Sequence, residues 1–359
     1  MTTRHDSRSR FYSIARVGRL FLGVAAAALG LVQTVLAAPF VLPMLDSPMA
    51  YVLRKGELEA TLMKEKINDT LDVFDVKASQ VQDIRPSAGL DVGAIGDLDG
   101  WRGVFGLGLA NRTLLRYVGK RQDIEFGRGT AHRVGEEIAV RHVMLRETPH
   151  RPAISIEPIY RANRGSGISR TFTEIEAFGL RIIPPTPVTL RLGGVHDESY
   201  GARALASKQV TDKLLLSLWA EISKVEVGSE VQTNLPVSQI RTLLDSLEYS
   251  SRHVVVGIGG HYVVSPRFVA YGELQHYDLD RDITPAIAGE VDTNDVVRGR
   301  LMYRMGPVSW LTLEGDYYAN QLGGEVPFLF NRLSASRFEK IYGFVGLGVT
   351  YQFSLGKER

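Results

Sequence analysis

The chain has 359 residues, with 42 Lys and Arg, 40 Asp and Glu, and no cysteine. Without cysteine it can form neither disulfides nor a thiolate metal site, and it cannot carry lipid on an N-terminal cysteine. The formal charge of +2 becomes −2 when residues 1–37, which hold five Arg and one Asp, are left out, so the composition gives no reason to expect a nucleic-acid partner.

The amino terminus is predicted to be a secretory signal peptide. Its five Arg residues precede an uncharged stretch at 20–37 that ends in small residues. A basic start, an apolar run and a small-residue site are the order expected of a signal peptide, here cleaved after Ala37. The alternative is an uncleaved membrane anchor, since the stretch is almost long enough to span a bilayer. No later segment approaches the roughly 18 consecutive apolar residues of a transmembrane helix.

The rest of the chain repeats one pattern, in which runs of alternating apolar and polar residues are separated by short groups of turn-forming residues. Segments 107–115 and 264–268 contain two of these turns. Such tight connections join neighbouring antiparallel strands. Longer polar links alternate with the short turns, for example at 227–251 and 321–340. We expect about sixteen strands, or fourteen as a fallback. The expected strands are 56–66, 71–79, 87–96, 101–110, 113–126, 134–146, 153–160, 172–183, 187–196, 201–210, 213–226, 252–264, 267–278, 295–305, 309–320 and 341–355.

The last expected strand, 341–355, shows the clearest alternation. Val345, Leu347, Val349, Tyr351 and Phe353 share one face, and the opposite face is more polar. An apolar band that ends in aromatic residues suits contact with lipid. The sequence therefore predicts an all-β chain that folds as a single antiparallel transmembrane β-barrel, with short turns at one end and long loops at the other. A soluble β-sandwich or a secreted solenoid is the alternative.

The ending Gly348, Tyr351 and Phe353, within the segment 348–353, resembles the C-terminal assembly signal of Gram-negative outer-membrane β-barrel proteins. It departs from that signal in having Gly346 where a polar residue is common and in continuing to residue 359. The resemblance implies location in the cell outer membrane, contact with outer-membrane lipid and recognition by the barrel-assembly machinery. The strand number is similar to that of porins, without pointing to a specific family. The implied organisation is a cleaved signal peptide at 1–37, a periplasmic N-terminal segment at 38–55, the barrel at 56–355 with short periplasmic turns and long extracellular loops, and a short tail at 356–359.

The hairpin at 295–320 contains the best polar constellation. The alternation places Arg298, Arg300 and Arg304 on one face of its first strand, and Glu314 and Asp316 on the same face of its second. A turn at 306–308 would set Arg300 opposite Glu314 and Arg298 opposite Asp316. Such cross-strand pairs stabilise a hairpin by about 0.2–1 kcal/mol, and inside a wet lumen they could also screen permeating ions. The alternative is that they only brace the interior.

Two further features concern the lumen. Trp219 and Glu221 share a strand face and are expected to line it, whereas Trp101 and Trp310 lie near opposite strand ends, as in aromatic girdles. In the long loop after the expected strand 213–226, residues 237–247 have an apolar stripe at helical spacing. This short helix could narrow the pore or simply pack on neighbouring loops.

Candidates for other chemistry are weaker. Carboxylates at 96–100 and 278–282 lack the full spacing of a calcium loop and are expected to be solvated turns. The run 196–199 has His, Asp, Glu and Ser, but closeness in sequence does not make a catalytic triad. No cofactor and no metal are expected.

The sequence predicts passive passage of small hydrophilic solutes or ions through the barrel. The first alternative is a non-conducting structural or interaction barrel that presents its loops. An enzyme barrel is third and is not expected, because no convergent catalytic set is visible.

Overall fold

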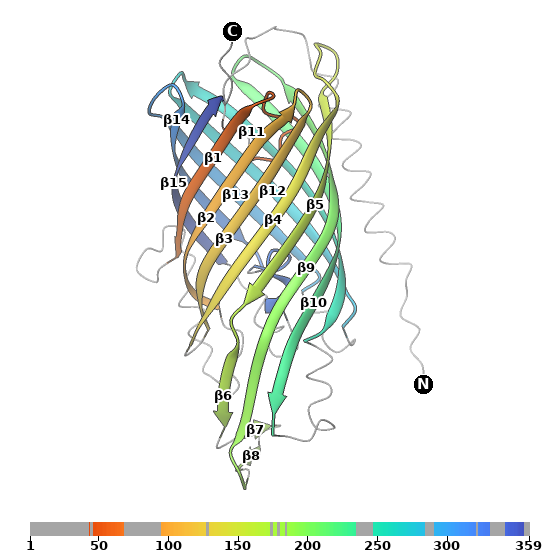
Figure 1. Cartoon of the computed structure of the whole chain (residues 1–359), viewed down its shortest axis with the longest axis vertical. Coiled ribbons are helices and arrows are strands. Elements are labelled where there is room, and N and C mark those ends of the chain that lie inside the picture. The colour runs from red at the N-terminus through yellow and green to blue at the C-terminus, as the bar shows by residue number, and fades with distance from the viewer. Residues whose placement is uncertain are drawn as a thin grey trace.

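The computed structural model describes residues 43, 46–67, 95–126, 129–172, 175–177, 180–183, 185–234, 247–283, 291–320, 322–330 and 342–354. Within these residues, twelve antiparallel strands close into a barrel (Figure 1). The ring strands are β1 (Glu57–Ile67), β2 (Ile95–Ala110), β3 (Thr113–Phe126), β4 (Gly129–Leu145), β5 (Ala153–Gly165), β9 (Val188–Gln209), β10 (Leu214–Thr233), β11 (Tyr249–Ser265), β12 (Phe268–Arg281), β13 (Thr293–Arg304), β14 (Ser309–Tyr318) and β15 (Tyr342–Ser354). The predicted fold class is confirmed.

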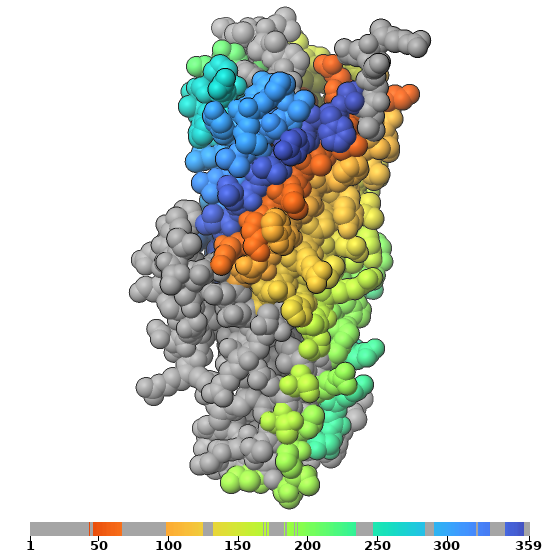
Figure 2. Space-filling view, turned by 60° about the vertical axis from the view of Figure 1, so that its left-hand side comes forward, coloured from red at the N-terminus to blue at the C-terminus, as the bar shows by residue number. Residues whose placement is uncertain are grey.

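The ring closes where the last strand meets the first. β15 pairs with β1 from Glu57 opposite Ser354 to Lys66 opposite Val345. Figure 2 shows the two strands lying against each other across the outer surface. On the far side of the ring β9 pairs with both β5 and β10. Closure satisfies the edge hydrogen-bonding groups that an open sheet would leave unpaired in lipid.

The predicted strand number is wrong, because neither sixteen nor fourteen strands form the ring. The segments predicted as strands 187–196 and 201–210 are one strand, β9, of 22 residues. Asp197 and Ser199 lie between them and are only 1% and 6% exposed. The predicted break between the two strands falls at these residues, but in a barrel with a polar interior such polar residues continue a strand.

Three other predicted strands account for the rest of the difference. Segment 172–183 contributes no ring strand: β6 (Ile168–Phe172) pairs only with the start of β9, and β7 (Ile175–Ala177) with β8 (Leu180–Ile182) forms a separate hairpin. The predicted strand 71–79 and residues 87–94 of the next one lie outside the described residues, whereas residues 95–96 belong to β2.

Side chains alternate between a lipid-compatible exterior and a polar interior. On β15 the side chains of Leu347, Tyr351 and Phe353 are 55%, 48% and 47% exposed, whereas that of Thr350, which directly precedes Tyr351, is 2% exposed. On β13 Val297 and Leu301 point outward in the same way. The predicted apolar exterior is thus confirmed. The described residues include no helix that is long and apolar enough to cross a membrane.

The connections differ between the two ends of the barrel. At one end, the top of Figure 1, the ring strands are joined by residues 111–112, 146–152, 210–213, 266–267 and 305–308. The start of β1 and the end of β15 lie at the same end. At the opposite end the connections are longer, except for residues 127–128 between β3 and β4, and β9 and β10 extend well beyond the other ring strands (Figure 1). We call these the short-turn end and the loop end.

Three expectations for single features are wrong. Residues 96–100 lie in β2, and residues 278–281 of the second acidic segment lie in β12, so neither forms a turn. Trp310 is 2% exposed and packs inside the barrel, so it does not belong to a lipid-facing girdle. Trp101 is 50% exposed on the outer face, where the Lys64 ammonium lies 5.1 Å from the ring centre.

Candidate functional site

The interior of the barrel contains two groups of buried ion pairs. The first, which we call the Glu157 cluster, is formed by strands β3, β4, β5, β9 and β10. Glu157 accepts from Arg141 Nε at 2.6 Å, from Arg203 Nη1 at 3.0 Å and from Arg116 Nη2 at 3.2 Å. The carboxylate is fully buried, and burial of a charge is tolerated only when it is paired and hydrogen-bonded. Three guanidinium groups from three strands meet this requirement.

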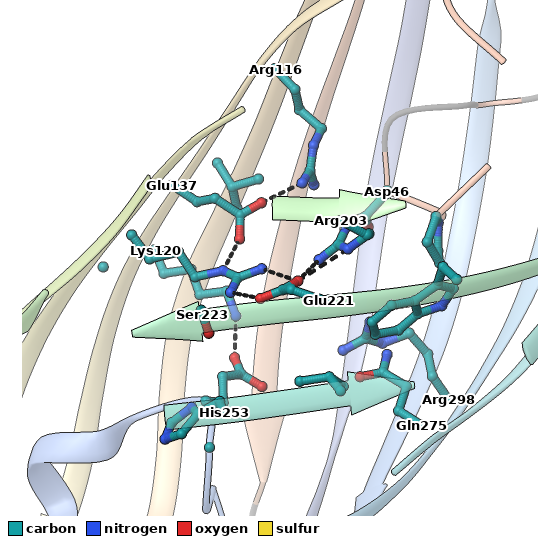
Figure 3. Close-up of a pocket in the computed structure, with 18 of the residues that line it drawn as sticks. Asp46, Arg116, Lys120, Glu137, Arg203, Glu221, Ser223, His253, Gln275 and Arg298 are labelled. Carbon is teal, nitrogen blue, oxygen red and sulfur yellow. Dashed lines mark hydrogen bonds and ion pairs between the residues drawn. The ribbon is translucent and has the colours of Figure 1, made fainter. Parts of the chain in front are cut away.

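Glu137 and Glu221 complete the Glu157 cluster. Arg161 bridges them, with a hydrogen bond from Nη2 to Glu221 Oε2 at 2.9 Å and an ion pair with Glu137. Arg203 Nη2 reaches the same oxygen of Glu221 at 2.7 Å. Figure 3 shows Glu221 beside Arg203, and Glu137 beside Arg116. Each carboxylate of this cluster is shared by at least two guanidinium groups.

The second group, the Glu314 cluster, lies on strands β1, β2, β12, β13 and β14. Its members are Glu65, Arg102, Glu273, Arg298, Arg300, Glu314 and Asp316. The strand register sets Arg300 opposite Glu314 and Arg298 opposite Asp316, so the predicted pairing of this hairpin is confirmed. Arg298 Nε and Nη2 each reach an oxygen of Asp316 at 2.8 Å. Glu314 also pairs with Arg102 from β2, a partner that the hairpin alone does not reveal.

The other residues singled out in the sequence occupy different positions. Arg304 donates to the main-chain oxygens of Gly306 at 3.2 Å and Pro307 at 3.0 Å, so it braces the turn at the short-turn end. Trp219 donates from Nε1 to Glu273 Oε1 at 3.0 Å, and the Arg203 guanidinium lies 4.8 Å from its ring. Trp219 therefore contacts members of both clusters.

The proposed assembly signal lies on β15. Tyr351 and Phe353 point outward, as described above. A Cβ on Gly348 would come within 2.8 Å of the Leu62 main-chain oxygen on β1, so glycine permits the close approach of the first and last strands here. Recognition of these residues by the assembly machinery stays a prediction.

A segment between β14 and β15, residues 322–330, folds into the barrel at the loop end. It includes the short 3-10 helix η1 (Pro327–Leu329). Val326 and Phe330 are 0% and 1% exposed and pack in an apolar core with residues of the surrounding strands. Tyr249 donates to the Pro327 main-chain oxygen at 2.7 Å, and the Phe328 main-chain N–H donates to Asp197 at 3.2 Å. We call this segment the loop-end cap.

Glu325 attaches the loop-end cap to the wall. Its carboxylate pairs with Lys120 of β3 and accepts from the Tyr318 hydroxyl of β14. Burial alone would raise the pKa of Glu325, but the charges of Lys120 and Arg133 outweigh it and hold the pKa below its usual value. The cap was missed in the sequence, although the uninterrupted apolar run 326–330 within a polar link was a visible signal.

The N-terminal segment 46–55 lies inside the barrel near the short-turn end. The Ala50 main-chain N–H donates to Ser207 Oγ at 2.8 Å, and its oxygen accepts from Ser155. Arg141 Nη1 reaches the Tyr51 oxygen at 3.3 Å. Burial and a hydrogen bond to Glu147 raise the pKa of the Tyr51 hydroxyl. The sequence analysis predicted a periplasmic segment at 38–55 and did not predict that residues 46–55 lie inside the barrel.

These two segments bound a central cavity of about 160 Å3. Asp46, Ser47 and Pro48 line it on one side, and Gly324 and Glu325 line it on the other. The walls are charged side chains of both clusters, together with Ser223, His253 and Gln275 (Figure 3). A second, wider cavity of about 640 Å3 lies on the other side of the N-terminal segment, among residues of the short-turn end. We call it the vestibule.

The residues of the run 196–199 do not converge on one site. His196 is exposed, whereas Asp197 points inward, so the residues of 196–199 alternate between the two faces of β9. Among the described residues no group of three or more His, Asp or Glu side chains could hold a metal ion. Of the predicted loop helix 237–247, residues 237–246 lie outside the described residues, and Leu247 is buried.

A closed antiparallel barrel with an apolar exterior and a charged interior defines an outer-membrane β-barrel protein. The chain resembles small porins and channels of that class, with no specific family. No family model matches it, and no curated protein does.

Similar folds occur among solved structures. The KdgM porin has 11% identity and a TM-score of 0.36, with 82% of this chain and 99% of that chain covered. The translocator domain of autotransporter NalP from Neisseria meningitidis has 10% identity and a TM-score of 0.46, with 96% of each chain covered. The CymD monoaromatic hydrocarbon channel has 10% identity and a TM-score of 0.41, with coverages of 86% and 90%. Likeness at this level concerns the barrel fold alone.

Proposed function

We propose that the protein is an outer-membrane channel for the passive passage of small hydrophilic solutes or ions. The observation that carries the proposal is the interior: charged side chains from most of the ring strands surround a central cavity, whereas the exterior is apolar. A barrel that served only as an anchor could be filled with apolar side chains. A charged lining suits a lumen that holds water and polar solutes.

The two clusters differ in charge, and this supports passage of polar rather than apolar solutes. The Glu157 cluster has four Arg and three Glu residues, so basic groups are in excess. The Glu314 cluster has three Arg residues and four acidic residues, so acidic groups are in excess. They lie on different parts of the ring, and the resulting field across the lumen would orient dipolar solutes and screen ions.

Single-channel recording of refolded protein in planar bilayers tests this function. We expect discrete conductance steps. Replacing Arg298 and Arg300 with Gln should shift the reversal potential towards cation preference, because Glu314 and Asp316 remain. Arg304→Gln is the matched control, since Arg304 binds turn carbonyls. A folded barrel that never conducts would refute the proposal.

The second candidate is a non-conducting barrel that presents its loops. It is favoured by the position of the N-terminal segment and the loop-end cap, each of which occupies the lumen near one end. The same recordings of the intact protein separate the two functions, because a non-conducting barrel would give no conductance steps. Outer-membrane lipid is the expected partner of the exterior in both cases.

A further inference from the structure

The N-terminal segment 46–55 is the part of the chain that separates the central cavity from the vestibule. Asp46, Ser47 and Pro48 line the central cavity, and Met49 together with residues 51–54 lines the vestibule. We propose that this segment is a removable plug that closes the channel at the short-turn end, and that Asp46 is the latch that holds it. The inference rests on the proposed channel function.

The plug is attached to the barrel through a single turn. β1 begins at Glu57, and before it the Glu57 main-chain N–H donates to the Arg54 oxygen at 2.9 Å. Gly56 in this turn has a φ of +79°, in the left-handed region that favours glycine, and a Cβ there would meet no atom within 4 Å. Because the described hydrogen bonds of Ala50 and Tyr51 go to wall side chains and not to a strand ladder, the plug can move without opening the sheet.

The wall keeps its ion pairs when the plug leaves. Arg141, which binds the Tyr51 oxygen, also has Glu157 at 2.6 Å. Arg102 retains Glu65 at 2.9 Å and Glu314, and Arg300 retains Glu314. None of these guanidinium groups is therefore left buried without a carboxylate. An unpaired buried charge would make the opening of the channel very costly. Ser207 likewise keeps Ser217 as a hydrogen-bonding partner at 2.9 Å.

Asp46 holds the inner end of the plug. Its Oδ2 lies 3.1 Å from Arg102 Nη2 and 3.4 Å from Arg300 Nη2, and its main-chain oxygen also accepts from Arg300. Its side chain is 18% exposed, against 5% and 2% for the two Arg side chains. Asp46→Asn keeps the size and removes the charge. Since hydrogen bonds to charged groups are the strong ones, we expect the ratio of open to closed channels to rise roughly tenfold.

Truncation provides the first test. A chain refolded from Leu53 lacks most of the plug and keeps the turn at 54–57, and it is compared with a chain refolded from Ala38. The truncated chain should show a higher conductance or a larger open fraction, with an unchanged heat-modifiable barrel on gels. Equal conductance and open fraction in both folded chains would overturn the plug while leaving the channel function intact.

Thiol labelling provides a second test that does not depend on conduction. The chain has no cysteine, so Ala50→Cys introduces a single thiol at a position that is 0% exposed. With a water-soluble maleimide it should react far more slowly than Asp212→Cys in an exposed turn. Adding Asp46→Asn should speed its reaction roughly tenfold. The control Asp99→Asn, which removes an exposed carboxylate paired with Lys64, should leave the rate unchanged.

The two tests separate the possible failures. An Ala50→Cys thiol that reacts as fast as the exposed one would overturn the plug, and equal rates with and without Asp46→Asn would overturn the latch. If neither chain conducts although both are folded, the channel function fails. The labelling rates then decide whether segment 46–55 leaves the lumen.

Discussion

Glu157→Gln is expected to be among the most destabilising single substitutions in the barrel wall. Glu157 is 0% exposed and pairs with Arg116, Arg141 and Arg203. Glutamine has nearly the same shape, so the substitution removes the charge and leaves the packing. Its effect therefore measures the electrostatic contribution of this carboxylate.

The expected loss of unfolding free energy follows from the carboxylates that each guanidinium group retains after the substitution. Arg116 retains Glu137 and Arg203 retains Glu221, so both stay paired. Arg141 has no other carboxylate among its described ion pairs, and its side chain is 1% exposed. Leaving one buried charge uncompensated costs about 3–5 kcal/mol, and we expect a loss of unfolding free energy in this range.

Urea unfolding of the refolded barrel in lipid vesicles, followed by tryptophan fluorescence, measures the effect. Arg141→Met in the Glu157→Gln background should restore part of the stability, because the unpaired charge is then gone, with a coupling energy of about 1–3 kcal/mol. Glu198→Gln, on the exterior of β9, is the matched control and should change stability by less than about 0.5 kcal/mol. A loss below about 1 kcal/mol for Glu157→Gln, with no coupling to Arg141, would refute the view that this cluster is a buried network.

Three further predictions concern other parts of the molecule. Phe353→Ala should lower the amount of heat-modifiable barrel in the outer membrane, and unchanged levels would count against the assembly signal. Glu325→Gln should make the loop-end cap accessible to protease at neutral pH. In the wild type the pKa of Glu325 is lower in the folded protein than its ordinary value of 4.5. The stabilisation of the cap by this carboxylate is therefore fully present above pH 4.5 and is lost only as the pH falls through the lower pKa of the folded protein. Limited proteolysis should accordingly find the same protected cap at pH 7 and at pH 5. Deleting 237–247 should leave the barrel folded, and loss of heat modifiability would show that the wall depends on this loop.

Period-two alternation was sufficient to predict much of the wall. It gave the outward and inward faces of β13, β14 and β15, and the short turn at 306–308 fixed the pairing of Arg300 with Glu314. These features depend only on residues that are close in sequence, so they can be predicted without knowing how the barrel closes.

Features that depend on closure could not be predicted in this way. Arg102 meets Glu314 only because β15 pairs with β1 and brings the ends of the chain together. The predicted break between 187–196 and 201–210 is wrong because Asp197 and Ser199 face a polar lumen, where polar side chains continue a strand. The plug has no periodic signal at all, and its place in the lumen follows from contacts with Ser155 and Ser207, far along the chain.

The length of β9 and β10 determines how far the protein extends beyond the membrane. A strand of 22 residues extends about 73 Å, whereas about 9–11 residues cross the bilayer. On the outer face of β10, Ile222 is 50% exposed, and two positions further on Lys224 pairs with Glu226 at 2.7 Å. Because charged side chains avoid the hydrocarbon, this pair marks the depth at which the lipid ends. Beyond it β9 and β10 continue past the other ring strands at the loop end, so the two strands stand outside the lipid on that side of the membrane.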